Sequence, residues 1–375
     1  MIKLLFFIES LSYNGLIGGA EKVLINLVNQ MDPQKYDITV QTVFPDLFSS
    51  LLKEHIHYKY CYKNKNRITA MLYRVEAETG LMYRCHIKNN YDIEAAFLEY
   101  GSTKVIAAST NKKAKKVAWI HCDLNIALKD KAGFVKKTEK QYKNYDKIIC
   151  VSEQCEKSFK EVFGGRFDPI VLHNVIDDEE IKRKALQALP DSVRKSKTVL
   201  CSVGNFTPPK NHLRLLRACK RLRLEGHDFE LWLVGDGMLR TEIENYIKDN
   251  GLEETVRLFG FQANPYPFMR AANLLVCSSD YEGYSTFITE GVILQKKILT
   301  TDCSGMQDIL GGYPAGRIVA NNDEAFFEGL IKYFQQPEEI SGCVSDSTVF
   351  STQKLVKENE AFFDTLVKNQ SRNKQ

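Results

Sequence analysis

The sequence predicts an α/β protein with two doubly wound parallel-sheet domains of the Rossmann type. Short apolar runs alternate with amphipathic stretches along the chain, which is typical of parallel sheets that carry helices on both faces. A length of 375 residues is more than one ordinary domain needs. A polar stretch from about His173 to Lys197 separates two series of such elements.

We expect a first domain over residues 1–175 and a second over residues 176–354. Residues 355–375 are expected to form a helix and tail that can pack back on the first domain, with fraying after Asp364 because this end is polar. No run approaches the length of about eighteen apolar residues that a membrane-spanning helix needs. The apolar start before Glu9 is also too short for the core of a signal peptide.

The first domain is expected to begin with a buried strand at Leu4–Ile8. The apolar residues of 20–31 recur at helical spacing and predict a helix. Residues 38–43 alternate like a strand, and later strands of the same sheet are expected at Val117–Ile120 and Lys147–Val151.

The second domain shows the alternation more clearly. Helices are expected at Asn211–Glu225, Leu239–Asn250, Phe287–Leu294 and Glu324–Phe334, and glycines follow the first two, where a left-handed residue commonly ends a helix. Strands are expected at Thr198–Val203, Phe229–Val234, Val256–Phe261, Leu274–Ser278, Ile298–Thr301 and Arg317–Ala320.

The net charge of +4 conceals a strongly basic segment. Residues 51–150 contain 20 Lys and Arg against 10 Asp and Glu, with Tyr interleaved. We interpret this segment as a surface attracted to an anionic membrane, with Lys112, Lys113, Lys115 and Lys116 as its main candidates. A solvated basic face is the plain alternative. Nucleic acid is not expected as a partner, because no RNA- or DNA-binding motif is present.

Functional residues are sought where strands end, because ligands of parallel sheets bind at the carboxyl ends of the strands. Gly18 and Gly19 follow the first strand and open a helix, so their N–H groups could approach an anion. Lys210 follows the strand Thr198–Val203 at the start of a helix, where a positive charge opposes the helix dipole. An anionic ligand would resolve that conflict.

The most specific signal is a pair of glutamates eight residues apart. Glu282 follows a strand, and Glu290 lies within a predicted helix. Gly283 allows close approach of the backbone, and Ser285 or Thr286 can cap the helix so that free N–H groups at its start hold a phosphate. The Glu290 carboxylate can accept two hydrogen bonds from a diol such as a ribose.

Together these residues resemble the retaining glycosyltransferases of family 4, which have the GT-B fold of two Rossmann-like domains facing across a cleft. The resemblance covers most of the chain, and its most specific part is the E-x7-E motif from Glu282 to Glu290. Other matching segments are Gly18-Gly19-Ala20-Glu21, Ile149-Cys150-Val151-Ser152-Glu153, Asn174-Val175-Ile176-Asp177, Val203-Gly204, Lys210 and Leu233-Val234-Gly235-Asp236-Gly237. Trp119-Ile120-His121-Cys122-Asp123 and Pro209-Lys210-Asn211-His212 are most similar to bacterial capsule and exopolysaccharide enzymes.

The resemblance implies roles for individual residues. Glu290 would bind the donor ribose, Glu282 would lie near the transferred sugar, His121 would line the sugar pocket, and Lys210 would neutralise the diphosphate. The expected catalytic residues are therefore Glu282, His121 and Lys210. The expected donor-binding residues are Gly18, Gly19, Asn205, Lys210, Gly283, Tyr284, Ser285, Thr286 and Glu290.

Two residues depart from the pattern of the family. Asn205 stands where the family usually has Arg, so one cation is missing beside the diphosphate, and His212 or Arg270 could compensate. Asp308 stands where many members have Glu. The first departure puts catalytic strength in doubt more than donor binding, because the leaving diphosphate needs charge neutralisation.

The resemblance further implies the reaction and its setting. A sugar would pass from a nucleotide-sugar, with UDP as the favoured nucleotide, to a glycan acceptor carried on a polyprenyl diphosphate. The configuration at the anomeric carbon would be retained, with the leaving phosphate taking the proton of the acceptor. We expect a cytoplasmic enzyme associated with the inner face of the cell membrane. No cofactor and no metal are expected, because no D-x-D motif follows a strand and the ten cysteines are scattered.

Three alternatives belong to other classes. A nucleotide-sugar epimerase on the same fold would need no acceptor. A non-catalytic donor-binding or partner subunit is suggested by Asn205, although Lys210 and both glutamates are present. A nicotinamide-dependent dehydrogenase is disfavoured because the glycines at Gly18-Gly19 lack G-x-G-x-x-G spacing.

Overall fold

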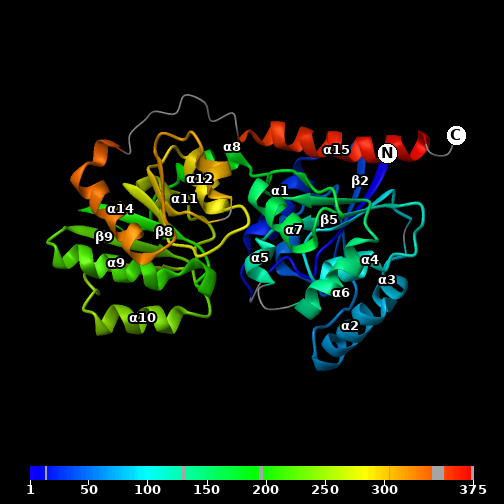
Figure 1. Ribbon diagram of the computed structural model, residues 1–375, viewed down its shortest axis with the longest axis horizontal. Coiled ribbons are helices and arrows are strands. Elements are labelled where there is room, and N and C mark those ends of the chain that lie inside the picture. Colours follow the sequence, from blue (N-terminus) through cyan, green and yellow to red (C-terminus); the bar gives the residue numbers. More distant parts are fainter. Residues whose placement is uncertain are drawn as a thin grey trace. The chain divides into compact units, whose positions relative to one another are not determined.

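The chain folds into two compact units, each with its own sheet (Figure 1). Unit 1 contains Met1–Ile176 and Thr352–Gln375, and unit 2 contains Asp177–Ser351. The computed structural model describes residues 1–12, 15–88, 90–128, 132–191, 193, 197–303, 305–339 and 350–372. The chain returns to unit 1 at Thr352, whose hydroxyl donates a hydrogen bond of 2.8 Å to the carbonyl of Ile176.

Unit 1 is built on a seven-stranded parallel sheet with the order β3-β2-β1-β4-β5-β6-β7. Its strands are β1 (Ile2–Phe7), β2 (Tyr36–Thr42), β3 (His57–Tyr60), β4 (Ile93–Ala96), β5 (Lys115–Ile120), β6 (Lys147–Cys150) and β7 (Ile170–Val171). The four strands predicted in this half are confirmed as β1, β2, β5 and β6, whose apolar residues fill the core. The other three strands are short, and sequence periodicity did not predict them.

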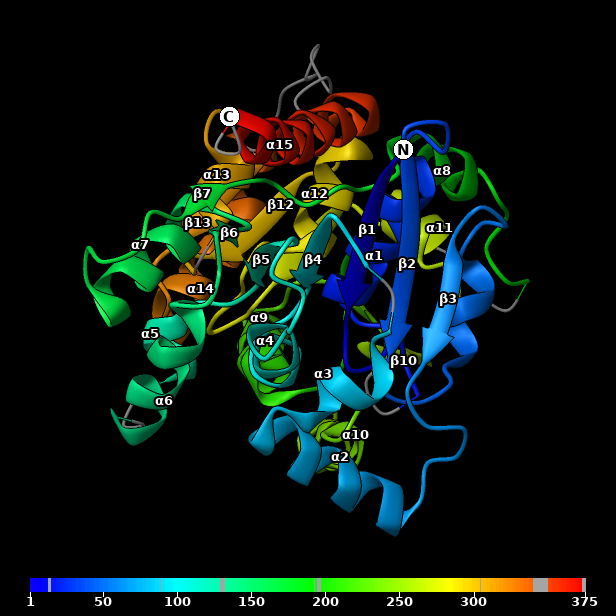
Figure 2. The same ribbon diagram turned by 90° about the vertical axis from the view of Figure 1, so that its right-hand side faces the viewer.

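The helices of unit 1 surround this sheet (Figure 2). They are α1 (Gly19–Gln30), α2 (Arg67–Thr79), α3 (Leu81–His86), α4 (Gly101–Ala107), α5 (Leu124–Ala127), α6 (Ala132–Tyr142), α7 (Glu153–Phe163) and α15 (Thr352–Arg372), with a 3₁₀ turn, η1, at Leu47–Leu51. The predicted helix over residues 20–31 is confirmed as α1.

The predicted fraying after Asp364 is wrong for residues 365–372, because α15 remains helical to Arg372, while residues 373–375 lie outside the described part of the chain. Tyr36 and Lys35 bind the Asp364 carboxylate at 2.7 and 2.6 Å, and Phe363 packs edge-on against Phe6 in the core. These contacts across the fold hold a segment whose polar composition alone favours disorder.

Unit 2 is built on a six-stranded parallel sheet with the order β10-β9-β8-β11-β12-β13. Its strands are β8 (Thr198–Val203), β9 (Phe229–Val234), β10 (Val256–Gly260), β11 (Leu274–Cys277), β12 (Ile298–Thr301) and β13 (Gly316–Val319). Its helices are α8 (Asp178–Ala185), α9 (His212–Leu224), α10 (Arg240–Asp249), α11 (Tyr266–Ala271), α12 (Thr286–Ile293), α13 (Met306–Leu310) and α14 (Asp323–Gln335), with 3₁₀ turns η2 at Pro208–Lys210 and η3 at Pro337–Glu339. All the elements predicted in this half are confirmed.

Each sheet has one place where the order of its strands reverses. In unit 1 this switch point lies between β1 and β4, and in unit 2 it lies between β8 and β11. Crossover segments leave in opposite directions there, so the loops after the two strands diverge and leave room for a ligand beyond the carboxyl ends. The residues that follow these strands are therefore the ones to examine.

Candidate active site

The site of unit 2 begins with the loop that follows β8. This loop closes into the 3₁₀ turn η2, and Asn211 then adopts a left-handed conformation with φ of 42°. Asparagine tolerates that conformation better than most residues. The Asn211 side chain caps α9 by accepting a hydrogen bond of 3.1 Å from the N–H of Arg214. Lys210 thus lies in a rigid turn just before α9.

Lys210 forms an ion pair with Glu282, which follows β11 on the other side of the switch point. Lys210 Nζ lies 2.6 Å from Glu282 Oε1, and the Ser279 hydroxyl donates a second hydrogen bond of 2.8 Å to the same oxygen. Burial disfavours the charged ammonium, but the Glu282 carboxylate outweighs this effect and the pKa of Lys210 is raised. The lysine is therefore a cation at neutral pH.

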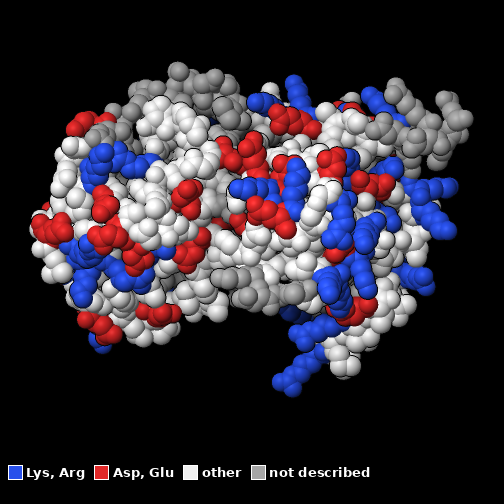
Figure 3. Space-filling model, in the orientation of Figure 1, with Lys and Arg blue, Asp and Glu red and all other residues white. Residues whose placement is uncertain are grey.

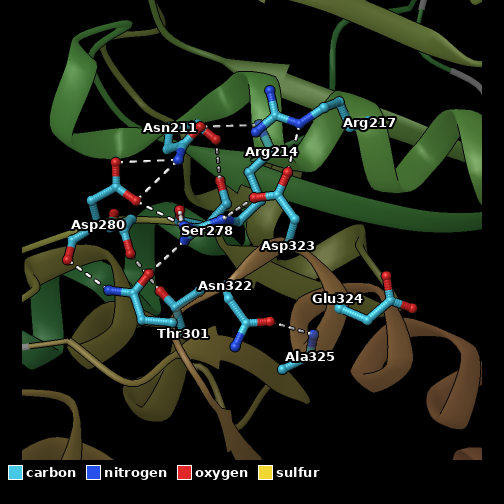
Figure 4. A network of polar contacts seen from close by, with 12 residues as sticks. Asn211, Arg214, Arg217, Ser278, Asp280, Thr301, Asn322, Asp323, Glu324 and Ala325 are labelled. Atoms are coloured by element: carbon cyan, nitrogen blue, oxygen red, sulfur yellow. Dashed lines mark hydrogen bonds and ion pairs between the residues drawn. The ribbon is translucent and has the colours of Figure 1, made fainter.

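A second group of contacts joins the loop after β8 to the loop after β11 (Figure 4). We call it the Arg214 network, and its members are Asn211, Arg214, Ser278, Asp280 and Asp323. The buried guanidinium donates to Asp323 Oδ1 at 3.0 Å, to the Ser278 carbonyl at 3.1 Å and to Asp280 Oδ1 at 2.9 Å. Asn211 Nδ2 binds the same Asp280 carboxylate at 3.0 Å. The network ties the turn that carries Lys210 to the loop that carries Glu282.

The N-terminus of α12 follows closely after Glu282, and its N-cap residue lies three positions further along the chain. Ser285 is the N-cap residue, but its side chain makes no capping bond, and the buried Ser285 Oγ has no hydrogen-bond partner among the described residues. The expectation that the Ser285 or Thr286 side chain caps this helix is thus not met. A buried hydroxyl without a partner is costly, so an acceptor from a ligand would be favourable here.

Glycines let the backbone of this loop pack tightly. Gly305 has a φ of +78°, and a Cβ atom at this position would lie 2.6 Å from the carbonyl oxygen of Gly283. Tyr284 follows and is buried. The loop between Glu282 and α12 therefore rests directly on the start of α13, which leaves it little freedom to move.

Glu290 is buried on α12, where the Tyr266 hydroxyl lies 3.4 Å from its Oε1. Tyr266 begins α11, a helix that was not predicted. A buried carboxylate needs hydrogen-bond donors, and the hydroxyls of a ribose are suitable ones. Asp308 lies on α13, in the neighbouring segment.

Asn205 and His212 supply no cation at this site. Asn205 lies in the loop after β8, half-buried, and His212 is buried with its ring 4.9 Å from that of Phe206. Burial, and then the charge of Lys210, lower the pKa of His212 to about 3, so it is neutral at pH 7. His212 therefore does not supply the positive charge of the missing arginine at neutral pH. Arg270 lies exposed at the end of α11.

The neutral state of His212 predicts a pH dependence of stability. Its pKa of about 3 in the folded state lies below the ordinary value of 6.5, so the unfolded chain binds the proton first as the pH falls. The stability that neutral His212 contributes is intact above pH 6.5 and is lost progressively below it. At pH 5 the loss in the free energy of unfolding is about 2 kcal/mol.

The prediction is checked by urea unfolding in a Trp119→Phe background, where buried Trp232 alone reports on unit 2. The free energy of unfolding should fall in the parent between about pH 7 and pH 5. In a His212→Asn variant this fall should be smaller by about 2 kcal/mol. Equal losses in both proteins would contradict a buried, neutral His212.

Unit 1 carries the remaining predicted residues. Gly18 is the N-cap of α1, and a Cβ atom there would lie 2.2 Å from a carboxylate oxygen of Glu21, so only glycine fits without a shift. His121 follows β5 with its ring 4.8 Å from that of Phe97. Burial lowers the pKa of His121 to about 3, and its buried Nε2 has no partner within the described residues.

Sequence reasoning missed the group that holds His121. Glu99 follows β4, on the far side of the switch point from β1, and its buried carboxylate accepts hydrogen bonds from the N–H groups of His121 and Cys122. Burial raises the pKa of Glu99. Its place after a strand was the signal that could have found it.

The four candidate lysines differ in burial and pairing. Lys115 and Lys116 belong to the start of β5 and are half-buried, with Lys115 Nζ 2.8 Å from Asp146. Lys112 and Lys113 lie exposed in the preceding turn. All four are at the amino end of β5, whereas His121 lies at its carboxyl end.

Among the residues that the structure describes, no group of three or more His, Cys, Asp or Glu side chains is placed to hold a metal ion.

Two family models match the chain. The one described as Glycosyltransferase Family 4 matches residues 17–180, and the one described as Glycosyl transferases group 1 matches residues 183–344. Together they span most of the sequence.

Curated relatives are similar over part of the chain. The N-acetylgalactosamine-N,N'-diacetylbacillosaminyl-diphospho-undecaprenol 4-alpha-N-acetylgalactosaminyltransferase of Campylobacter jejuni is 36% identical over 162 residues, which are 43% of this chain and 42% of that protein. The lipopolysaccharide core biosynthesis glycosyltransferase LpsD of Rhizobium meliloti is 29% identical over 153 residues, 40% of this chain and 42% of that protein. The matches thus span less than half of the length of either relative.

Solved structures are similar over nearly the whole chain. Anabaena HepE in complex with UDP-glucose has a TM-score of 0.76 at 17% identity, covering 97% of this chain and 100% of that chain. Sucrose-phosphate synthase from Thermosynechococcus elongatus has a TM-score of 0.75 at 14% identity, covering 99% of this chain and 98% of that chain. At such identities the likeness shows the fold. The chain therefore belongs to the family 4 glycosyltransferases, and its two parallel-sheet units are those of the GT-B fold.

Proposed function

We propose that the chain transfers a sugar from a UDP-sugar to a glycan carried on a polyprenyl diphosphate, with retention of configuration, in polysaccharide biosynthesis. The observation that carries the proposal is the ion pair of Lys210 and Glu282 across the switch point of unit 2. Glu282 lies three residues before Ser285, the N-cap residue of α12. The complex of HepE with UDP-glucose and the diphospho-undecaprenol in the name of the Campylobacter relative support this choice of donor and acceptor.

In this proposal the leaving diphosphate takes the place of Glu282 as the partner of Lys210. The ammonium and the free N–H groups of α12 would neutralise the charge that develops as the glycosidic bond breaks, without a bound metal. The Ser285 hydroxyl, which lacks a partner among the described residues, would donate to a phosphate oxygen. Glu282, released from the ion pair, would then lie free to contact the sugar.

The remaining groups complete the mechanism. Glu290 would accept hydrogen bonds from the donor ribose, and neutral His121 would bind the sugar through its unpartnered Nε2. Glu282 and Glu290 do not act as a glycosidase pair, because such a pair flanks one glycosidic bond. The leaving phosphate would take the proton of the acceptor hydroxyl on the same face, which retains the configuration. We further propose that the enzyme works at the cytoplasmic face of the membrane, where its acceptor would be anchored.

Glu290→Gln is expected to weaken the binding of UDP about tenfold, because a neutral amide accepts weaker hydrogen bonds from the ribose hydroxyls than a carboxylate does. The measurement is thermal stability with UDP, GDP, ADP and NAD. A ligand at about 100 times its Kd stabilises a protein by about 2.7 kcal/mol, so the loss of one decade of affinity is readily seen.

Glu253→Gln, at an exposed position of the same unit, is the matched control and should respond to UDP as the parent does. If no nucleoside diphosphate shifts the parent protein, the donor assignment fails and a non-catalytic role takes its place. A shift with NAD alone would favour a dehydrogenase instead.

A further inference from the structure

Helix α2 of unit 1 exposes a row of large apolar side chains. Ile68, Met71, Leu72 and Val75 are 71, 64, 40 and 50% exposed. Their spacing of three and four residues places them on one face of the helix. We call these four residues the α2 stripe. Single exposed apolar residues are ordinary on protein surfaces, but a contiguous row of them marks a site of interaction.

The opposite face of α2 is anchored to the unit. The Tyr73 hydroxyl donates a hydrogen bond of 2.5 Å to Glu9, Ala77 is buried, and Glu76 accepts hydrogen bonds from Tyr62 at 2.6 Å and from His86 at 2.9 Å. Asn66 and Thr69 form a capping box at the start of the helix. The helix is thus fixed in place with its stripe outward.

Basic side chains flank the α2 stripe. Lys63, Lys65, Arg67 and Arg74 are all exposed, and none of them forms an ion pair within the described residues. The acidic residues of the helix are already engaged, since Glu76 faces inward and Glu78 is paired with Lys104 and Lys137. Figure 3 shows Lys and Arg gathered over this α2–α6 end of unit 1. An anionic partner fits this charge.

The stripe also lies at the functional end of the sheet. Glu9, the partner of Tyr73, follows β1 at its carboxyl end. Figure 2 shows α2 beyond the arrowheads of β1, β2 and β3. His121 follows β5 at the same end, whereas Lys112 and Lys113 precede β5 at the opposite end.

We propose that the α2 stripe and its flanking basic residues dock unit 1 on an anionic lipid bilayer. Apolar side chains on one face and cations beside them are the features of a helix that lies in the plane of a membrane interface. Within the described residues no helix is long and apolar enough to cross a bilayer, so this contact would be peripheral. The inference rests on the proposed function in one respect, because a lipid-linked acceptor gives the enzyme a reason to sit on a bilayer.

The test is flotation of the full chain with vesicles of equal parts phosphatidylglycerol and phosphatidylcholine, and with vesicles of phosphatidylcholine alone. The triple variant Ile68→Gln/Met71→Gln/Val75→Gln should lower the partition coefficient on the anionic vesicles at least about tenfold, because the apolar contacts with the interface are lost. Lys63→Gln/Lys65→Gln should lower it severalfold, and less so at high salt.

Two matched controls carry equivalent changes elsewhere. Leu186→Gln/Leu224→Gln removes exposed leucines of unit 2, and Lys112→Gln/Lys113→Gln removes lysines at the amino end of β5. Both should bind vesicles within about twofold of the parent. A triple variant that floats like the parent would overturn the proposal. So would a parent that sediments as a dimer while the triple variant is a monomer, because the stripe would then be covered by a second copy.

UDP binding by the same proteins separates this inference from the proposed function. Every variant should keep the thermal response of the parent to UDP, since α2 belongs to the other unit from the Lys210 site. Loss of flotation with no UDP response in any protein would leave the docking surface standing and the donor assignment refuted.

Discussion

Replacing Lys210 by methionine is expected to lower kcat/KM for the UDP-sugar by about 100- to 1,000-fold, the effect of removing one preorganised group that stabilises developing negative charge. The ammonium lies in a rigid turn, and Asn205 stands where the family usually has an arginine. Because His212 is neutral, it does not substitute for the ammonium. Methionine keeps the apolar length of the side chain and removes only its charge.

The measurement is UDP release from a panel of UDP-sugars, using the donor that the parent cleaves fastest. Lys248→Met, at an exposed position on α10, is the matched control and should release UDP at the rate of the parent. Lys210→Met also leaves Glu282 without its cation, so stability must be separated from turnover. The double variant Lys210→Met/Glu282→Gln should recover stability but not activity. Parental turnover in Lys210→Met would refute its role at the diphosphate.

The strands of unit 2 and its helices α9, α10, α12 and α14 were predictable because each carries a full apolar or amphipathic period, whereas α8, α11 and α13 were not predicted. β11 reads Leu-Leu-Val-Cys and is buried at every position. Once the strands are known, the loops that follow them are known too, and this is how Lys210 and Glu282 became candidates, while the resemblance to family 4 gave Glu290 its role. The general rule that parallel sheets bind ligands at their carboxyl ends supplied the rest.

Other features depend on contacts between distant residues. β4 has Glu94 in its middle, which interrupts the apolar pattern, and this carboxylate is tolerated because Tyr83 and Asn111 donate to it at 2.7 and 3.1 Å. The ion pair of Lys210 with Glu282 joins residues 72 positions apart. Local periodicity contains no information on such pairings, so neither strand nor ion pair could be predicted.

The basic segment shows the same limit. Sequence alone counts charges, but it does not tell which side chains are paired. Lys115 lies in an ion pair with Asp146 at the amino end of a strand, while Arg67 and Arg74 of α2 form no ion pair with any residue that the structure describes and lie beside apolar residues. Burial and pairing, rather than charge number, single out the α2 stripe.

Arg214→Ala is expected to lower the free energy of unfolding of unit 2 by about 3 kcal/mol, at the lower end of the range for breaking a buried ion pair. The guanidinium is almost fully buried, but its partners Asp280 and Asp323 have about half of their side-chain surfaces exposed, so water can partly replace it. Urea unfolding followed by Trp232 fluorescence in the Trp119→Phe background measures the loss.

Arg217→Ala is the matched control, because Arg217 lies outside the Arg214 network but binds one of its members. Arg217 binds only Asp323 in Figure 4 and is half-exposed, so its removal should cost less than about 1 kcal/mol. Arg214→Lys should lower the free energy of unfolding nearly as much as Arg214→Ala. A single ammonium cannot reach Asp280, Asp323 and the Ser278 carbonyl together.

We also expect Arg214 to position the proposed donor site, and UDP binding measures this role separately from stability. The guanidinium joins the turn of Lys210 to the loop of Glu282 without touching either side chain. Its loss should therefore weaken UDP binding about tenfold at a temperature where the variant is still folded, since misplacing a bound group by about 1 Å is costly. A variant that loses stability but binds UDP as the parent does would show that Arg214 only holds the fold, and that the two loops keep their places through α9 and the sheet.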